Sequence, residues 1–271
     1  MVGGTSGIGL AIALRLATAK ANVTIMGRNK AAADNIVVTL KERNPGGTHA
    51  FIPVEASLMA SVKEACGKFK DSHSKLDILV TCQGGAPSLK GRVETPEGLD
   101  TKMATHYFGR VLFWRQLAPL LEESPSPRIL TVHGFNDDYK EYKSDFDVKS
   151  HYSMVNVANA CGMYMDIAVD CMSKEHPKLF LVHAAPGVVK TGWGKDWPWY
   201  WRLPIRALQG MIATSPESCA EFMCEPLLRK QVTPGSFLLM GPHDNVLKKS
   251  KLHDEARDFV WEQTVNVLGN F

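Results

Sequence analysis

Short apolar runs alternate with longer amphipathic stretches along almost the whole chain. Runs with the length of buried strands lie at residues 22–26, 50–54, 76–80, 129–132, 179–183 and 237–240. Stretches with a helical spacing of apolar residues lie at 7–20, 30–43, 57–71, 99–121, 152–174 and 216–228. This alternation predicts a doubly wound parallel sheet covered by helices on both faces, a three-layer Rossmann-like α/β fold. No linker interrupts the pattern, so we predict one domain over residues 1–271.

A glycine-rich turn opens the chain. Gly3, Gly7 and Gly9 have a spacing that allows a tight turn, a close approach to a pyrophosphate and close packing of a helix on the sheet. The predicted phosphate-binding residues of this turn are Gly3, Thr5, Ser6, Gly7, Ile8 and Gly9. A β-strand normally precedes and aims such a turn, and this chain begins too close to it, so we expect the first strand to be absent.

The next predicted strand ends where the adenosine ribose of a dinucleotide is expected. An acidic residue at that point would bind the free 2′-hydroxyl of NAD. The chain instead has Arg28, whose planar cation suits a 2′-phosphate, followed by Asn29. Both are candidate cofactor residues, and NADP(H) is the predicted cofactor. The alternative is that Arg28 is an ordinary solvated side chain at a strand end.

Four further segments stand where a known family has its motifs. They are Glu55-Ala56-Ser57, the run 76–84 ending in Gln83-Gly84, Tyr152 at the start of a long helix, and Pro186-Gly187-Val188-Val189-Lys190-Thr191. In order and spacing the chain resembles the short-chain dehydrogenase/reductases, and some details resemble a divergent fungal branch. The resemblance implies further cofactor contacts at Glu55, Ala56, Gln83, Gly84, Tyr152, Gly187, Val189 and Thr191. It also implies a homo-oligomer formed through the long helices.

The resemblance further implies a partly altered catalytic centre. Tyr152 matches the tyrosine that passes a proton in this family, but the lysine expected four residues later is Asn156. The asparagine position on the preceding long helix is His106, and the serine position falls on Gly134 with His133 adjacent. The candidate catalytic residues are therefore Tyr152, Asn156, His133 and His106. Each has an ordinary alternative, as a packed aromatic, a surface amide or a hydrogen-bonded histidine.

Loss of the lysine favours one direction of reaction. With an unperturbed pKa of about 10, tyrosine is almost wholly protonated at neutral pH, so it can serve as an acid for carbonyl reduction but poorly as a base for alcohol oxidation. His133 or His106 would polarise the substrate oxygen or relay a proton. A second Y-x-x-x-K, from Tyr139 to Lys143, lies in the polar stretch 136–151 and is expected to be a solvated surface loop.

An aromatic segment at about 192–212 predicts the substrate side. It holds five large rings: Trp193, Trp197, Trp199, Tyr200 and Trp201. Following the carboxyl end of a strand, such a segment would roof the ligand crevice and suit a small lipophilic carbonyl substrate. The same rings would also fit a lid packed on its own protein, a dimer contact or a membrane-surface patch.

Composition narrows the partners. A net charge of +3 gives no argument for nucleic acid, and no apolar run approaches the roughly 20 residues of a transmembrane helix. Six scattered cysteines without metal-ligand spacing suit a reducing, cytoplasmic setting and predict no metal site, although an N-terminal signal cannot be judged. Two functions stay open: an NADPH-dependent reductase, or a catalytically weak NADP(H)-binding sensor or scaffold. A truncated, poorly folded chain is a third reading.

Overall fold

A computed structural model describes residues 1–84, 91–134, 138–191 and 213–271. Six parallel strands form its centre: β1 (Val23–Gly27), β2 (His49–Pro53), β3 (Ile78–Thr81), β4 (Arg128–Val132), β5 (Phe180–Ala184) and β6 (Ser236–Met240). β1 pairs with β2, and β3 to β6 pair in chain order. The central strands β4 and β5 are buried at every residue, whereas β2 at the edge is not. All six predicted strands are confirmed within two residues at each end.

The N-terminal residues occupy part of the place where the first strand was expected to be missing. Val2 forms isolated parallel bridges to Met26 of β1 and to Thr81 of β3, which joins the two groups of strands. The Val2 N–H donates to the Val80 carbonyl, and the Gly3 N–H donates to the Met26 carbonyl. The turn that follows therefore leaves the sheet from between β1 and β3.

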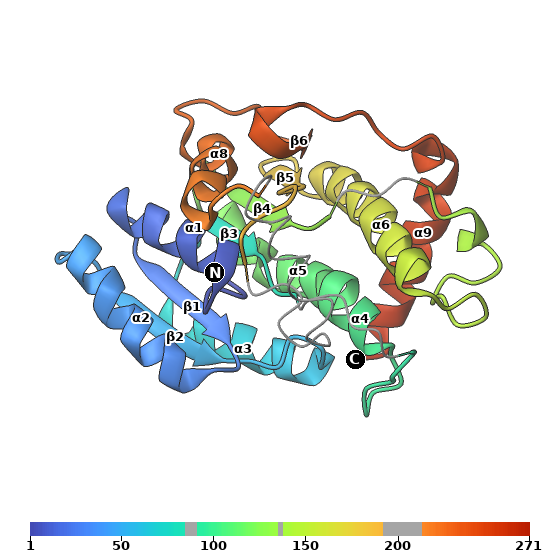
Figure 1. Ribbon diagram of the computed structural model, residues 1–271, viewed down its shortest axis with the longest axis horizontal. Coiled ribbons are helices and arrows are strands. Elements are labelled where there is room, and N and C mark those ends of the chain that lie inside the picture. Colours follow the sequence, from blue (N-terminus) through green and yellow to red (C-terminus); the bar gives the residue numbers. More distant parts are fainter. Residues whose placement is uncertain (85–90, 135–137, 192–212) are drawn as a thin grey trace.

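Two layers of helices cover the sheet (Figure 1). One layer contains α1 (Gly7–Thr18), α2 (Lys30–Arg43) and α8 (Pro216–Leu228), with α1 packed between the other two. The other contains α3 (Met59–Ser72), α5 (Gly109–Glu122) and α6 (Met154–Glu175), with α9 (His253–Gly269) packed on α6. Two hydrophobic clusters, one beneath each layer, form the core. The predicted three-layer α/β fold is confirmed.

Two helical features differ from the sequence expectation. The stretch predicted as one helix over 99–121 is divided into α4 (Thr101–Met103), a π-helical turn at Ala104–Phe108 and α5. The C-terminal helix α9 was not predicted, because its buried residues recur only every fourth position in a polar sequence: Ala256, Val260, Thr264 and Leu268. Within the described ranges, no helix is long and apolar enough to cross a membrane.

Two short 3₁₀ turns also lie in the described part of the chain. A 3₁₀ turn at Lys140–Tyr142 lies in the segment between β4 and α6, and another at Pro242–Asp244 follows β6. Because the strands are parallel, their carboxyl ends meet at one edge of the sheet, where ligands bind in open α/β folds. The residues after Val2, β1, β2, β3, β4 and β5 therefore share that edge.

Candidate active site

The glycine turn has a shape that only glycine permits at two positions. Gly3 has a φ of +78°, and a β-carbon there would lie 2.5 Å from the backbone nitrogen of Gln83. A β-carbon on Gly9 would overlap the carbonyl oxygen of Gly3, so the start of α1 lies directly against the turn. Gly7 also has a positive φ, of +56°. The backbone thus leaves a cradle that β-carbons would fill.

The N-terminus of α1 faces this cradle with unsatisfied backbone groups. Ser6 is the N-cap, but its side chain makes no hydrogen bond to the helix, and the first turn contains no acidic residue. Thr5 and Ile8 flank it, and both are half-buried. The first N–H groups of a helix lack intrahelical partners and attract anions. These groups suit a phosphate anion, and a diphosphate at this turn stays a prediction.

The Pro-Gly-x-Val-x-Thr segment meets this turn. A β-carbon on Gly7 would lie 3.3 Å from Cγ2 of Thr191, so the two segments are almost in contact. Gly187 has a φ of +69°, which few other residues adopt, and Val189 forms a parallel bridge to Thr214. The two segments, whose contacting residues Gly7 and Thr191 are 184 positions apart in the sequence, therefore lie side by side at the edge of the sheet. The predicted aromatic lid at 192–212 lies outside the described residues.

Arg28 lies at the carboxyl end of β1, with its side chain 75% exposed. Its guanidinium is 3.4 Å from the Glu55 carboxylate, which also accepts hydrogen bonds from the N–H and hydroxyl of Ser57. Glu55 therefore tethers the arginine without burying it. The Asn29 side chain caps α2, because its oxygen accepts a hydrogen bond from the Ala32 N–H at 2.9 Å.

The residues after β3 include an unsatisfied amide. The Gln83 side chain is buried, and neither its oxygen nor its nitrogen has a hydrogen-bond partner in the described part of the chain. A buried primary amide without partners is costly, and a bound ligand would satisfy it. Gly84 faces His106, and a β-carbon there would lie 2.9 Å from the imidazole. Ala56, by contrast, is a packing residue whose carbonyl abuts Gly109.

The two predicted histidines lie side by side. His106 is in the π-helical turn and His133 follows β4, with ring centroids 5.2 Å apart and nearly perpendicular planes. Burial, followed by the charges of Arg110 and Lys102, lowers the pKa of His106 to about 3. Burial and the neighbouring His106 and Arg110 also lower the pKa of His133 well below its usual range. Both imidazoles are therefore neutral at physiological pH.

Arg110 is the buried cation beneath these histidines, and sequence reasoning missed it. Its guanidinium donates to the carbonyls of Thr81, Gln83 and Val132 and to the Thr131 hydroxyl, at 2.5–3.1 Å. Burial lowers its pKa to about 10, so it stays charged at neutral pH. It ties together the loops after β3 and β4. The signal was an arginine inside the apolar run Gly109–Trp114.

The sequence also did not reveal a buried histidine–aspartate pair next to His133. His183 of β5 and Asp166 of α6 are fully buried, with Nδ1 and Oδ1 2.5 Å apart. The ring centroids of His133 and His183 are 6.4 Å apart. His106, His133 and His183 thus form a row that runs from the carboxyl edge of the sheet toward its core.

Tyr152 lies immediately before α6 rather than within it, because Ser153 is the N-cap and accepts from the Asn156 N–H. The Tyr152 hydroxyl accepts a hydrogen bond from Nζ of Lys102, in α4, at 2.7 Å. Burial and then Asp100 raise the pKa of Tyr152 to about 12, so the phenol is protonated at neutral pH. The Asn156 amide donates to the His151 carbonyl at 2.7 Å, directed away from the phenol.

The loop before Tyr152 corrects one sequence expectation. Tyr139 and Tyr142, expected to be solvated, are 2% and 3% exposed. The Tyr139 hydroxyl donates to Asp145, whose buried carboxylate also accepts the N–H groups of Lys149, Ser150 and His151. These bonds fold the chain around Asp145, and the segment that they organise ends immediately before Tyr152. Tyr139 points inward because the buried Asp145 carboxylate accepts its hydroxyl, whereas most other polar side chains of the loop are exposed, as the sequence predicted.

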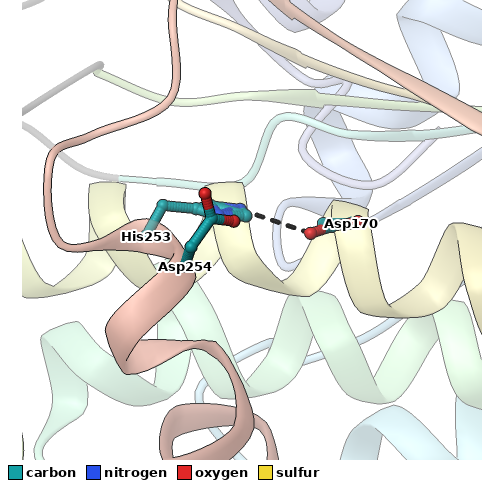
Figure 2. Close-up of side chains that lie close together, drawn as sticks. All are labelled: Asp170, His253 and Asp254. Atoms are coloured by element: carbon teal, nitrogen blue, oxygen red, sulfur yellow. Dashed lines mark ion pairs between the residues drawn. The ribbon is translucent and has the colours of Figure 1, made fainter.

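One cluster of possible metal ligands lies away from this site, between α6 and α9 (Figure 2). The two ring nitrogens of buried His253 lie 3.6 Å from Asp170 and 3.7 Å from Asp254. Two ammonium groups already neutralise the carboxylates, because Lys174 is 2.9 Å from Asp170 and Lys249 is 3.2 Å from Asp254. Lys249 also lies 3.7 Å from Asp170, so the group is better described as an ion-pair network that links α6 to the start of α9 than as a metal site.

The sequence is similar to a known protein family and to several curated proteins. Residues 1–196 match the family model of short chain dehydrogenases. An oxidoreductase of Emericella nidulans is 35% identical over 192 residues, covering 70% of this chain and 57% of that protein. The oxidoreductase andH of Emericella variicolor is 32% identical, covering 75% and 64%, and human polyprenol dehydrogenase is 28% identical, covering 81% and 69%. The chain thus spans about three-fifths of the length of the two fungal relatives.

Solved structures show the same fold at low identity. L-sorbose reductase from Gluconobacter frateurii, complexed with NADPH and L-sorbose, has a TM-score of 0.65 at 20% identity, covering 90% of this chain and 94% of that one. An NADPH-bound short chain oxidoreductase from Pseudomonas aeruginosa with an atypical catalytic center has a TM-score of 0.62 at 20% identity, covering 90% and 95%.

Proposed function

The chain belongs to the short-chain dehydrogenase family, and from that premise we propose that it is an NADPH-dependent oxidoreductase that reduces a lipophilic carbonyl compound. One observation carries the proposal. The segments that follow the carboxyl ends of the strands hold a glycine cradle, a buried Gln83 amide without hydrogen-bond partners, and a protonated Tyr152. The cradle would hold the diphosphate, and Arg28 the 2′-phosphate. When bound, NADPH supplies hydride to the carbonyl carbon.

The proton side of the reaction belongs to this chain's own residues. Tyr152 gives its hydroxyl proton to the carbonyl oxygen, and its high pKa keeps that proton in place until then. His133 and His106, being neutral, donate hydrogen bonds without carrying charge and hold the oxygen where the family's serine is missing. Gly187, Val189 and Thr191 would lie beside the nicotinamide of a bound cofactor.

Support for the cofactor and the substrate class comes partly from relatives. Several structural neighbours are described with NADPH or NADP and one with NAD, and the exposed arginine at the adenosine end favours NADPH for this chain. A lipophilic substrate agrees with the aromatic sequence of 192–212 and with a human relative named for polyprenol. We also propose one domain, a cytoplasmic location consistent with six free cysteines, and a homo-oligomer.

One experiment tests the reductase. Fluorescence titration with NADPH and NADH measures binding, and NADPH consumption with a panel of lipophilic ketones and quinones measures turnover. Tyr152→Phe is expected to lower kcat by about 10²- to 10⁴-fold, the range of general acid catalysis, without changing the affinity for NADPH. Tyr142→Phe, which removes a hydroxyl bonded to Glu255, is the matched control. Unchanged turnover in Tyr152→Phe would rule out this role for the tyrosine.

The altered centre also supports a second candidate, an NADP(H)-binding sensor with little turnover. Gly134 stands at the serine position and Asn156 at the lysine position, with its amide engaged by the His151 carbonyl. A sensor would bind NADPH tightly yet consume none with any member of the panel, and its unfolding temperature would rise with NADPH concentration.

A further inference from the structure

The Tyr152 hydroxyl has a cationic neighbour from a different helix. Nζ of Lys102 donates to the phenolic oxygen at 2.7 Å and lies 5.0 Å from the centre of the ring. Lys102 belongs to α4, fifty residues before the tyrosine, and not to the helix that follows it. An ammonium placed on a phenolic oxygen is a charge-assisted hydrogen bond, stronger than a neutral one.

The position of Lys102 is built into the fold. Asp100, which is 2% exposed, caps α4 by accepting the N–H groups of Lys102 and Met103, each at 3.0 Å. Met103 is buried in the core, so this turn is anchored on both sides. Besides Lys102, three charged or titratable groups act on the phenol: Asp100 of the α4 cap and Cys161 of α6 raise its pKa, and Arg92 lowers it.

We propose that Lys102 is the positioning residue of Tyr152, stabilising from α4 the charge that the phenol develops during proton transfer. This inference rests on the proposed function, in which Tyr152 is the proton donor. As the O–H bond of Tyr152 breaks, its proton goes to the substrate oxygen; NADPH, when bound, would supply the hydride that the carbonyl carbon needs. The phenolic oxygen keeps the bonding pair and becomes negative until a solvent proton restores it. The ammonium is worth most at that moment.

The position that resembles the family's lysine does not do this work. The Asn156 side chain donates to the His151 carbonyl, and a neutral amide offers no charge to a phenolate. The chain instead places a lysine of α4 against the phenolic oxygen of Tyr152. Sequence reasoning from the Tyr152 helix alone has no means of finding it.

The test compares Lys102→Met with Lys68→Met, a lysine on α3 that pairs with Glu64. Lys102→Met is expected to lower kcat by about 10- to 100-fold, the value of a charged hydrogen bond, with KM and NADPH affinity within about threefold of wild type. Lys102→Arg, which keeps the charge, should recover part of the loss. The double variant Lys102→Met with Asn156→Lys should also recover part, because it returns an ammonium from the neighbouring helix.

A readout without turnover decides the pairing independently. The ¹³Cζ resonance of labelled Tyr152, assigned by its disappearance in Tyr152→Phe, should shift in Lys102→Met and remain unchanged in Lys68→Met. If Tyr152→Phe loses turnover while Lys102→Met retains both kcat and the resonance position, the inference is overturned and the proposed function stands. If Tyr152→Phe itself retains turnover, the tyrosine's role in the proposed function fails, and a shifted resonance would show only the contact.

Discussion

The carboxylate of Asp145 organises the loop that ends at Tyr152, and its removal tests that organisation. Burial acts to raise its pKa, but the N–H groups of Ser150, His151 and Lys149 outweigh burial and lower it to about 2. The unfolded value is 3.8. Because one pKa unit corresponds to about 1.4 kcal/mol, the ionised carboxylate contributes about 2.5 kcal/mol to the free energy of unfolding at neutral pH.

The sign of this linkage sets the pH window. A lowered pKa in the folded state means that the stabilisation is complete above the unfolded value and is lost as pH falls through the folded value. The contribution should therefore be constant from about pH 5 to 7 and fall to roughly half near pH 3. Acid should loosen the loop even while the sheet remains folded.

Urea unfolding from pH 3 to 7, followed by circular dichroism, measures the effect in Asp145→Asn. The expected loss is about 2.5 kcal/mol at pH 7, and it should shrink as pH falls. Asp147→Asn is the matched control, because that carboxylate lies on the same loop, is 51% exposed and pairs with Arg92. Turnover should also fall in Asp145→Asn, since Tyr152 follows the organised segment. Equal, pH-independent losses in the two variants would refute the reasoning.

Three other predictions test separate parts of the molecule. Arg28→Ala should weaken NADPH binding by about 10- to 100-fold and leave NADH binding unchanged, with Lys30→Ala as control; equal losses for both cofactors would contradict the 2′-phosphate contact. Gly9→Ala should lower stability by roughly 1–3 kcal/mol and disrupt NADPH binding, whereas Gly67→Ala, with open space around it, should not destabilise; melting temperatures decide. Burial lowers the pKa of His253 from 6.5, so the free energy of unfolding should decline as pH falls below 6.5. His253→Gln should reduce the slope of this free energy against pH by up to about 1.4 kcal/mol per pH unit. Parallel slopes of the two proteins in urea unfolding would exclude this.

The sequence predicted the sheet well because its strands are continuous apolar runs, and such runs are buried on both faces of a parallel sheet. It predicted the glycine cradle because a positive φ at Gly3 restricts the residue type. The sequence did not predict α9, because only about one residue in each turn of that helix is buried. It did not identify Arg110, because the partners of this side chain include backbone carbonyls at the ends of distant strands. Tyr139 was misplaced because the buried Asp145 that receives its hydroxyl has the same sequence appearance as a surface carboxylate.

The buried charge of Arg110 explains how a centre with histidines still depends on its tyrosine. That charge is held by oxygen atoms at the ends of β3 and β4, and burial first, with this charge adding to it, disfavours a proton on either His106 or His133. In the proposed reduction a neutral imidazole can orient the carbonyl oxygen, but delivering a proton from it would leave an imidazolate, a stronger base than the Tyr152 phenolate. The Tyr152 oxygen also has the Lys102 ammonium within hydrogen-bond distance. The electrostatics therefore assign orientation to the histidines and proton transfer to Tyr152.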